Sequence, residues 1–263
     1  MTDWQRIADA DFAVPDGTSR DALAAELAGA LADPDPQVRD GAAYAVLATW
    51  ISRGEFDGQL PWLGAAMAER FADARVQARA FAPLVLAWVT ERGGYDGQWV
   101  RAFADWYPAE TDLRGYDSEL GWLHAVAHGA DLLGVLGRHP QVQPESMLRL
   151  GACRMLAGSD VVWRDQEDDR LAFALALTLT RPELTAAQST GWLVPIDERF
   201  AAGEPGPVPV FASNTMRTLR MLYLLADRGV RPEPAAAPLT LTRRDDVLDR
   251  VAHTLAAVAW FAG

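Results

Sequence analysis

Apolar residues recur every three or four positions along most of the chain, the spacing that places them on one face of a helix. These segments alternate with short breakers made of Gly, Pro or charged residues. Sustained alternation of apolar and polar residues, typical of a half-buried strand, is missing from the sequence. The pattern therefore predicts an all-α protein.

One of the predicted helices has a close counterpart further along the chain. It follows Asp33-Pro34-Asp35-Pro36, with Asp35 expected as N-cap and Pro36 at the first helical position, where a missing N–H costs nothing. The stretch 75–89 repeats its apolar pattern, and Val76 stands 76 − 38 = 38 positions after Val38. The pattern D-P-x-V-R-x-x-A-A-x-x-L in residues 33–47 resembles HEAT-like repeats. A period of this size predicts stacked helical hairpins.

The whole pattern is that of a HEAT-like α-solenoid of about five helical hairpins plus a terminal helix, in one domain spanning residues 1–263. Pro195 should kink or shorten the first helix of the fifth hairpin. The first helices of the hairpins are expected at 19–32, 58–72, 97–107, 144–157 and 182–202. The second helices are expected to begin near Asp35, Arg75, Ser118, Glu167 and Pro209, and the terminal helix near Arg243.

Composition narrows the class of protein. With 263 residues, half of them hydrophobic, the chain can bury a sizeable core. It has no apolar run approaching the roughly 20 residues of a membrane span, and its start lacks the features of a secretory signal, so we expect a cytoplasmic protein. Cys153, the single cysteine, rules out a disulfide framework, and its helical surroundings predict a small core residue.

The charge of the chain bears on its partners. The formal net charge is −12, and because the sequence has no lysine, all 24 positive charges are arginines. An acidic surface repels phosphate backbones and anionic headgroups. The balance argues against binding to nucleic acid or to a membrane.

Histidine and acidic residues gather between 112 and 133. In a helix that begins near Ser118, His124, His128 and Asp131 are separated by four and three residues and share one stripe, with Trp122 on the opposite, apolar side. Two imidazoles and a carboxylate can hold a divalent metal, and either histidine can act as a general base. The zinc-protease pattern H-E-x-x-H is absent. Alternatively, the stripe is a polar network between hairpins or a solvated face.

Further polar residues stand at the starts of later second helices. Equivalent helices of a solenoid line one surface, so these residues are expected to face the same groove as the histidines. Guanidinium groups bind carboxylate or phosphate in a bidentate manner, which favours a polar or anionic small molecule or peptide as ligand. Alternatively, the arginines pair with Glu167, Asp168 or Asp112 and lock neighbouring repeats. The polar residues concerned are Asp168, Arg170, Asn214, Arg217 and Arg220.

The central stretch G-W-L-H-A-V-A-H-G-A-D-L-L, preceded by E-T-D-L-R-G-Y, resembles the signature of an uncharacterised bacterial family known only as a domain of unknown function with HEAT-like helices. The resemblance covers residues 100–225 and is weaker at 167–172 and 214–223. It implies a helical-repeat fold and supplies no activity. The matching positions are Asp112, Arg114, Gly115, Tyr116, Gly121, Trp122, His124, His128 and Asp131.

Two functions follow as hypotheses. The first is a binding or scaffold protein with a polar groove. The second is an enzyme, such as a metal-dependent hydrolase, in which His124, His128 and Asp131 are catalytic residues or ligands of a divalent metal. Nucleic-acid repair on a helical scaffold is disfavoured by charge, and the sequence carries no P-loop, dinucleotide or nucleophile-elbow motif. The ligand-binding residues of the groove are predicted to be Asp112, Arg114, Trp122, Asp168, Arg170, Asn214 and Arg217.

Overall fold

The computed structural model describes residues 2–204 and 206–259. The described chain is predominantly helical and contains one short two-stranded sheet, in agreement with the predicted all-α class. Its contacts form two compact units. The N-terminal unit comprises the residues up to 106 together with 112–132, and the C-terminal unit comprises 107–111 together with the residues from 133 onwards.

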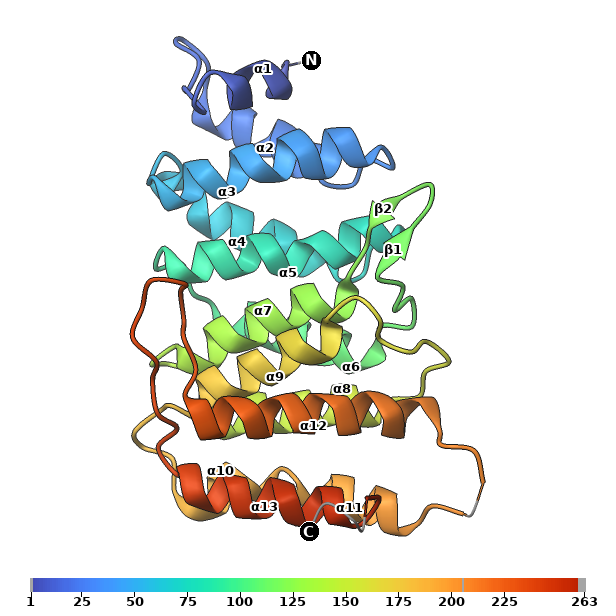
Figure 1. Ribbon diagram of the computed structural model, residues 1–263. Helices are drawn as coiled ribbons and strands as arrows, with labels where there is room; N and C mark the ends of the chain where they lie inside the picture. The colour runs from blue at the N-terminus through green and yellow to red at the C-terminus, as the bar shows by residue number, and fades with distance from the viewer. Residues whose placement is uncertain (1, 205, 260–263) are drawn as a thin grey trace. The chain divides into compact units, whose positions relative to one another are not determined.

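The N-terminal unit consists of paired helices followed by a hairpin (Figure 1). Its helix α2 packs against the π-helix η1, and α4 packs against α5. Leu27, Val46, Trp50 and Leu63 are buried in its core. The elements are α1 (Trp4–Asp9), α2 (Arg20–Ala30), η1 (Gln37–Tyr44), α3 (Ala45–Ser52), the 3-10 helix η2 (Asp57–Gln59), α4 (Leu60–Arg70), α5 (Val76–Glu91), most of α6 (Gly97–Ala109), β1 (Tyr116–Asp117), β2 (Gly121–Trp122) and the first half of α7 (Ala125–Arg138).

The entry turns of two successive helical pairs in this unit share one hydrogen-bonding pattern. Before η1, the Asp33 carboxylate accepts from the N–H of Asp35, and Arg39 Nη1 donates to the Asp33 carbonyl at 3.1 Å. Before α5, the Asp73 carboxylate accepts from the N–H of Arg75. Arg79 Nη1 likewise donates to the carbonyl of Asp73, at 2.8 Å. Equivalent positions are therefore 79 − 39 = 40 residues apart, not the 38 given by matching the valines.

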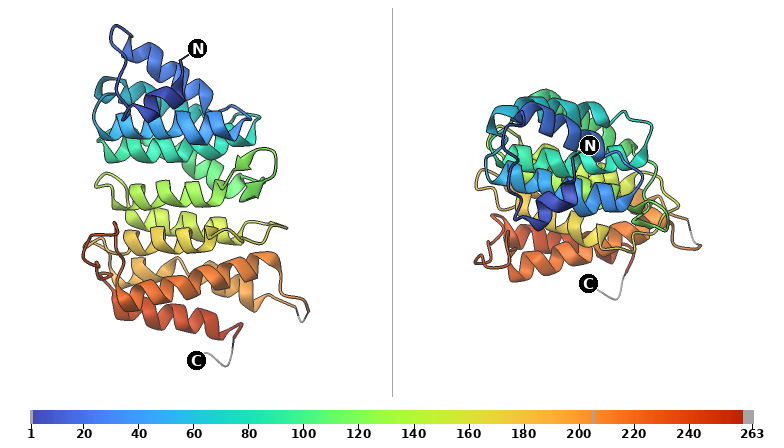
Figure 2. Two further views of the ribbon diagram at one scale, coloured as in Figure 1. Left: turned by 45° about the horizontal axis from the view of Figure 1, so that its top comes forward. Right: turned by 90° about the horizontal axis from the view of Figure 1, so that it is seen from above.

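The C-terminal unit is built around α12, which packs against α8, α9 and α13 (Figures 1 and 2). Gly137 lets the second half of α7 approach α9, since a Cβ there would lie 2.0 Å from Oγ1 of Thr178. The other elements are α8 (Pro144–Leu156), α9 (Glu167–Thr178), α10 (Ala186–Gly191), α11 (Val194–Ala201), α12 (Val210–Arg228) and α13 (Arg244–Ala256). The stretch 182–202 is divided into α10 and α11, and Pro195 stands in the first turn of α11, as expected from its effect on helices.

Two local expectations are wrong. The helix expected from Ser118 begins only at Ala125, and a β-hairpin occupies the preceding residues. The carboxylate of Asp117 accepts from the N–H groups of Glu119 and Leu120, and Gly121 has φ +70°, so the chain turns where helical spacing suggested continuation. Cys153 is exposed on α8 rather than part of the core, because its side chain lies outside the stripe that this helix buries.

Within residues 2–204 and 206–259, every helix is too short or too polar to cross a bilayer.

Candidate functional site

A short antiparallel hairpin precedes α7. Tyr116 pairs with Trp122 and Asp117 with Gly121. The side chains of Tyr116 and Trp122 are 58% and 45% exposed, and their rings meet edge to face with centroids 5.0 Å apart. Helical spacing predicts Trp122 on the buried side of a helix, and this prediction is also wrong. Because the residue lies in a strand instead, its indole is on the surface.

Arg39 is completely buried and anchors this hairpin by hydrogen bonds to its backbone. Its guanidinium donates to the carbonyls of Leu120 and Trp122, forms an ion pair with Asp40 and lies 4.9 Å from the centroid of the Phe81 ring. Burial raises the pKa of Asp40, and the hydrogen bond from Arg39 opposes that rise. Arg39 is the arginine of the D-P-x-V-R pattern, but nothing in that pattern predicts contact with a hairpin so far along the chain.

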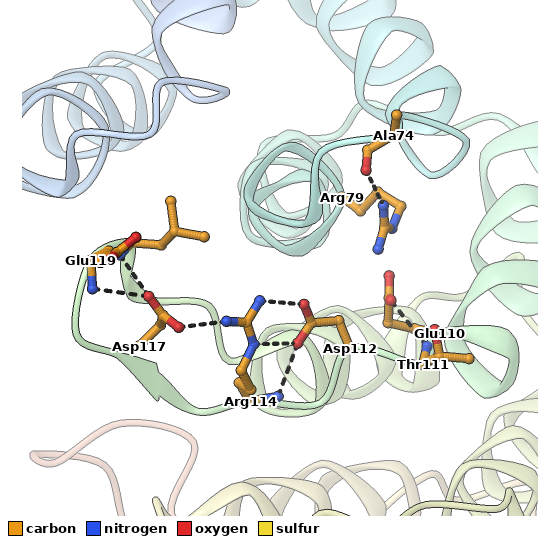
Figure 3. A network of polar contacts seen from close by, with 9 residues as sticks. Ala74, Arg79, Glu110, Thr111, Asp112, Arg114, Asp117 and Glu119 are labelled. Carbon is orange, nitrogen blue, oxygen red and sulfur yellow. Dashed lines mark hydrogen bonds and ion pairs between the residues drawn. The ribbon is translucent and has the colours of Figure 1, made fainter.

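Arg114 lies between two carboxylates (Figure 3). Its Nε and Nη2 donate to Asp112 at 2.8 and 2.6 Å, and its Nη1 donates to Asp117. The Arg114 hydrogen bonds lower the pKa of Asp112, and the N–H groups of Leu120 and Glu119 do the same for Asp117. The two carboxylates neutralise the charge of Arg114, and the three-residue cluster carries one net negative charge.

The two histidines of the stripe lie together and are buried, with 8% and 7% of their surface exposed. The rings of His124 and His128 stack with centroids 5.7 Å apart, and the rings of Trp122 and His124 meet edge to face with centroids 4.4 Å apart. His124 immediately precedes α7 and has φ +49°, a left-handed conformation that costs a non-glycine residue about 1–2 kcal/mol. Such strain in a native structure is typical of functional sites.

His128 is held in one orientation. Its Nδ1 lies 2.9 Å from the carbonyl oxygen of Ala80, and its ring packs edge to face on Phe81. Because a carbonyl only accepts, Nδ1 carries the hydrogen, and in the neutral ring the lone pair is on Nε2. This arrangement suits a proton acceptor or a metal ligand at Nε2. Asp131 is half-buried in α7, three positions after His128.

A second group of predicted residues converges in the C-terminal unit. Arg217 Nε lies 2.7 Å from Oδ2 of Asp168, and its Nη1 donates to the carbonyl of Trp163. The Asp168 side chain is 4% exposed, whereas that of Arg217 is 38% exposed. Among the described residues, the buried Oδ1 of Asp168 accepts no hydrogen bond. Burial raises the pKa of this carboxyl, and the charge of Arg217 opposes the rise.

The segment before α9 is anchored by its neighbours. The buried Asn214 accepts from the N–H of Trp163 at 3.1 Å and donates to the carbonyl of Val161 at 3.0 Å. Glu167 accepts from the N–H of Asp165 at 2.8 Å, and the intervening Gln166 has φ +67°. Burial is the main cause that raises the pKa of Glu167, and the charges of Asp165 and Asp168 add to it.

Arg170 is half-buried in α9, and its charge acts on the hydroxyl of Tyr107. Burial raises the pKa of Tyr107, while the cations of Arg154 and Arg170 oppose the rise. Arg154 is almost fully buried and donates to the carbonyls of Tyr107 and Glu110 at 2.8 and 2.9 Å. The sequence gives no signal for Arg154, because one arginine in an amphipathic helix resembles any other.

The structure thus groups the predicted residues within each unit. Trp122, His124 and His128 are in contact in the N-terminal unit, where Asp112 and Arg114 form an ion pair. In the C-terminal unit, Arg217 binds Asp168, and Asn214 and Arg217 both bind the backbone of Trp163. One groove shared by all of these residues stays a prediction.

Comparison with known proteins gives a family but no activity. No curated protein and no solved structure matches the chain. One family model, described as a protein of unknown function (DUF2785), matches residues 65–224, which is more than half of the chain. The matched region contains both candidate clusters. The chain is therefore a member of the uncharacterised DUF2785 family.

Proposed function

We propose that this protein is a HEAT-like α-solenoid that binds a polar ligand carrying a carboxylate or phosphate group, as a small molecule or as a peptide segment. The solenoid part rests on the hydrogen-bonded entry turns of Arg39 and Arg79, which recur in successive helical pairs of the N-terminal unit. Repetition of one supersecondary unit is the basis of solenoid folds.

The observation that carries the binding function is the setting of Arg217. A guanidinium has five N–H donors in a rigid plane. Asp168 and the carbonyl of Trp163 engage Arg217 on its buried side, and 38% of the side chain is exposed. The remaining N–H groups suit bidentate recognition of an anionic oxygen pair, and the fixed orientation reduces the entropy lost on binding.

Within the N-terminal unit, the hairpin by itself offers a contact surface for an apolar or planar group. Exposed aromatic rings supply large contact areas at low conformational cost. Tyr116 and Trp122 contact each other, and Arg39 fixes the backbone of Trp122. Their rings are therefore held in place before any ligand arrives.

The test is a binding titration with defined anions. Inorganic phosphate, citrate and hexaglutamate are titrated calorimetrically into the wild type, Arg217→Lys and Arg220→Gln. Lysine keeps the charge but loses the planar fork, so we expect at least one anion to bind about tenfold more weakly to the lysine variant. Arg220 lies one helical turn further along α12 and is exposed, so Arg220→Gln reports the effect of removing one charge from this helix.

Equal affinities for the wild type and Arg217→Lys, or no binding of the three anions, would contradict the proposal. Weaker binding to Arg220→Gln with unchanged binding to Arg217→Lys would show that only the overall charge of α12 matters. The folded state of each variant is checked by circular dichroism.

A second candidate function is an enzyme that uses His124, His128 and Asp131, a metal-dependent hydrolase included. It is favoured by one observation, the hydrogen bond that fixes Nδ1 of His128 on the Ala80 carbonyl. Elemental analysis of purified protein tests the metal form. The metal-dependent form of this hypothesis predicts a stoichiometric divalent ion in the wild type and the loss of this ion in His128→Ala.

A further inference from the structure

We infer that the C-terminal unit contains a separate binding pocket for a carboxylate attached to an apolar body. The pocket has a volume of about 410 Å³ and lies between α11, the start of α12 and residues 203–204 and 206–209 of the connection. Its volume falls within the roughly 300–1,000 Å³ that small-molecule sites occupy. The inference does not depend on the function proposed for Arg217.

The walls of this pocket are mainly apolar. Phe200 and Phe211 come from the two helices, Met216 lies deeper along α12, and Val208 and Val258 are 66% and 38% exposed. When a ligand covers exposed apolar side chains, the removal of apolar surface from water favours binding. Methionine adapts to ligands of different shape, because its side chain is unbranched and flexible. The walls therefore favour an alkyl or aryl body.

Arg199 supplies the polar end of the site. Its guanidinium lies over the ring of Phe211, with its carbon 4.8 Å from the ring centroid. Among the described residues, Arg199 forms no ion pair and no hydrogen bond. Stacking occupies one face of the planar guanidinium and leaves the N–H groups at its edge, where a carboxylate binds in bidentate fashion. A cation held beside an apolar hollow matches an amphiphilic carboxylate.

One acidic side chain, that of Glu204, also lines the pocket as far as the structure describes it. It is exposed and follows the end of α11. A carboxylate ligand is repelled by Glu204, so removing this charge is expected to strengthen binding. A cationic ligand would show the opposite response, and this difference makes Glu204 a test of the sign of the ligand's charge.

The experiment compares decanoate with decanol, which share an alkyl chain and differ in charge. Both are titrated calorimetrically into the 263-residue chain below the concentration at which micelles form. For Arg199→Gln, we expect about fivefold to tenfold weaker binding of decanoate and unchanged binding of decanol. For Glu204→Gln, decanoate should bind more tightly. Val208→Asp, at an exposed position of the wall, should weaken both, because it places a charge beside the alkyl chain.

Three outcomes would overturn the inference. Decanoate could fail to bind the wild type, Arg199→Gln could weaken decanoate and decanol alike, or Val208→Asp could leave both affinities unchanged. Because Arg199, Glu204 and Val208 are all exposed, loss of folding is not expected, and the unfolding midpoint of each variant verifies this. Arg217→Lys serves as the control that separates this pocket from the proposed anion site.

Discussion

Asp168 and Arg217 form an ion pair whose two members differ in exposure. Their atoms Oδ2 and Nε are 2.7 Å apart, with the carboxylate side chain 4% exposed and the arginine side chain 38% exposed. The arginine retains access to water, but the carboxylate depends on its partner and its few neighbours. Removing one partner is therefore not equivalent to removing the other.

Arg217→Met should be more destabilising than Asp168→Asn. The first change leaves a buried carboxylate without its cation, at a cost of about 2–4 kcal/mol at pH 7, while the second leaves a hydrated cation and costs about 1 kcal/mol. Protonation of Asp168 removes the unpaired buried charge, so the loss of stability caused by Arg217→Met should become smaller as the pH is lowered. Urea unfolding at pH 7 and pH 4.5 measures both effects. Equal costs at pH 7 would contradict this account.

Glu167→Gln should increase stability at neutral pH. The pKa of Glu167 is raised above its ordinary 4.5, mainly by burial. The folded state therefore holds this proton at pH values where the unfolded state has lost it, and stability falls as the pH rises through the folded pKa. Glutamine keeps the oxygen that accepts from Asp165 and removes the charge. Denaturation curves should give the variant a higher free energy of unfolding than the wild type at pH 7 and an equal one below about pH 4. A constant difference across this range would exclude the titration of Glu167 as the cause.

Arg39→Met should destabilise the N-terminal unit by about 2–4 kcal/mol, because the carbonyls of Leu120 and Trp122 and the carboxylate of Asp40 lose their donor. The control is Arg53→Met, since the ion pair of Arg53 with Asp11 is exposed and is worth about 0–1 kcal/mol. Chemical unfolding gives both values. Amide hydrogen exchange of residues 116–122 should also become faster in the Arg39 variant, and unchanged exchange would show that the hairpin needs no support.

His128→Asn and His128→Ala separate structure from chemistry. The amide nitrogen of asparagine can take the place of Nδ1 and donate to the Ala80 carbonyl, whereas alanine leaves this carbonyl without its donor and creates a void. We expect a loss of about 2–3 kcal/mol for alanine and a clearly smaller loss for asparagine. Thermal unfolding compares the two. If both variants lose the same stability, the hydrogen bond to Ala80 is not what fixes the ring.

Gly137→Ala should cost about 1–3 kcal/mol, because the added methyl group would overlap Thr178 on α9. The matched control is Gly29→Ala in α2, where a Cβ meets nothing within 4 Å. Alanine is the better helix former by about 0.8–1.0 kcal/mol, so this variant should be more stable than the wild type. Opposite signs in one denaturation series would confirm that packing, rather than propensity, selects Gly137. The same sign for both would contradict it.

The sequence by itself determined the local elements. Apolar spacing placed α2, α4 and α8 to within a few residues, and Pro195 marked the division between α10 and α11, because helix periodicity and proline geometry act within a few residues of the chain. Its motifs also indicated the family that the comparison confirms. Spacing failed at residues 116–122, where hydrogen bonds from Asp117 and the positive φ of Gly121 produce a hairpin.

Only the tertiary structure decided which polar groups meet. It paired Arg217 with Asp168, satisfied Arg114 with two carboxylates, buried Arg39 beneath a hairpin about 80 positions away in the chain and left Arg199 on a phenylalanine ring beside a pocket. All four are arginines in an acidic chain and look alike in the sequence. Their roles differ because burial and the nearest acceptor, which depend on contacts between distant segments, set the energetics of a charge.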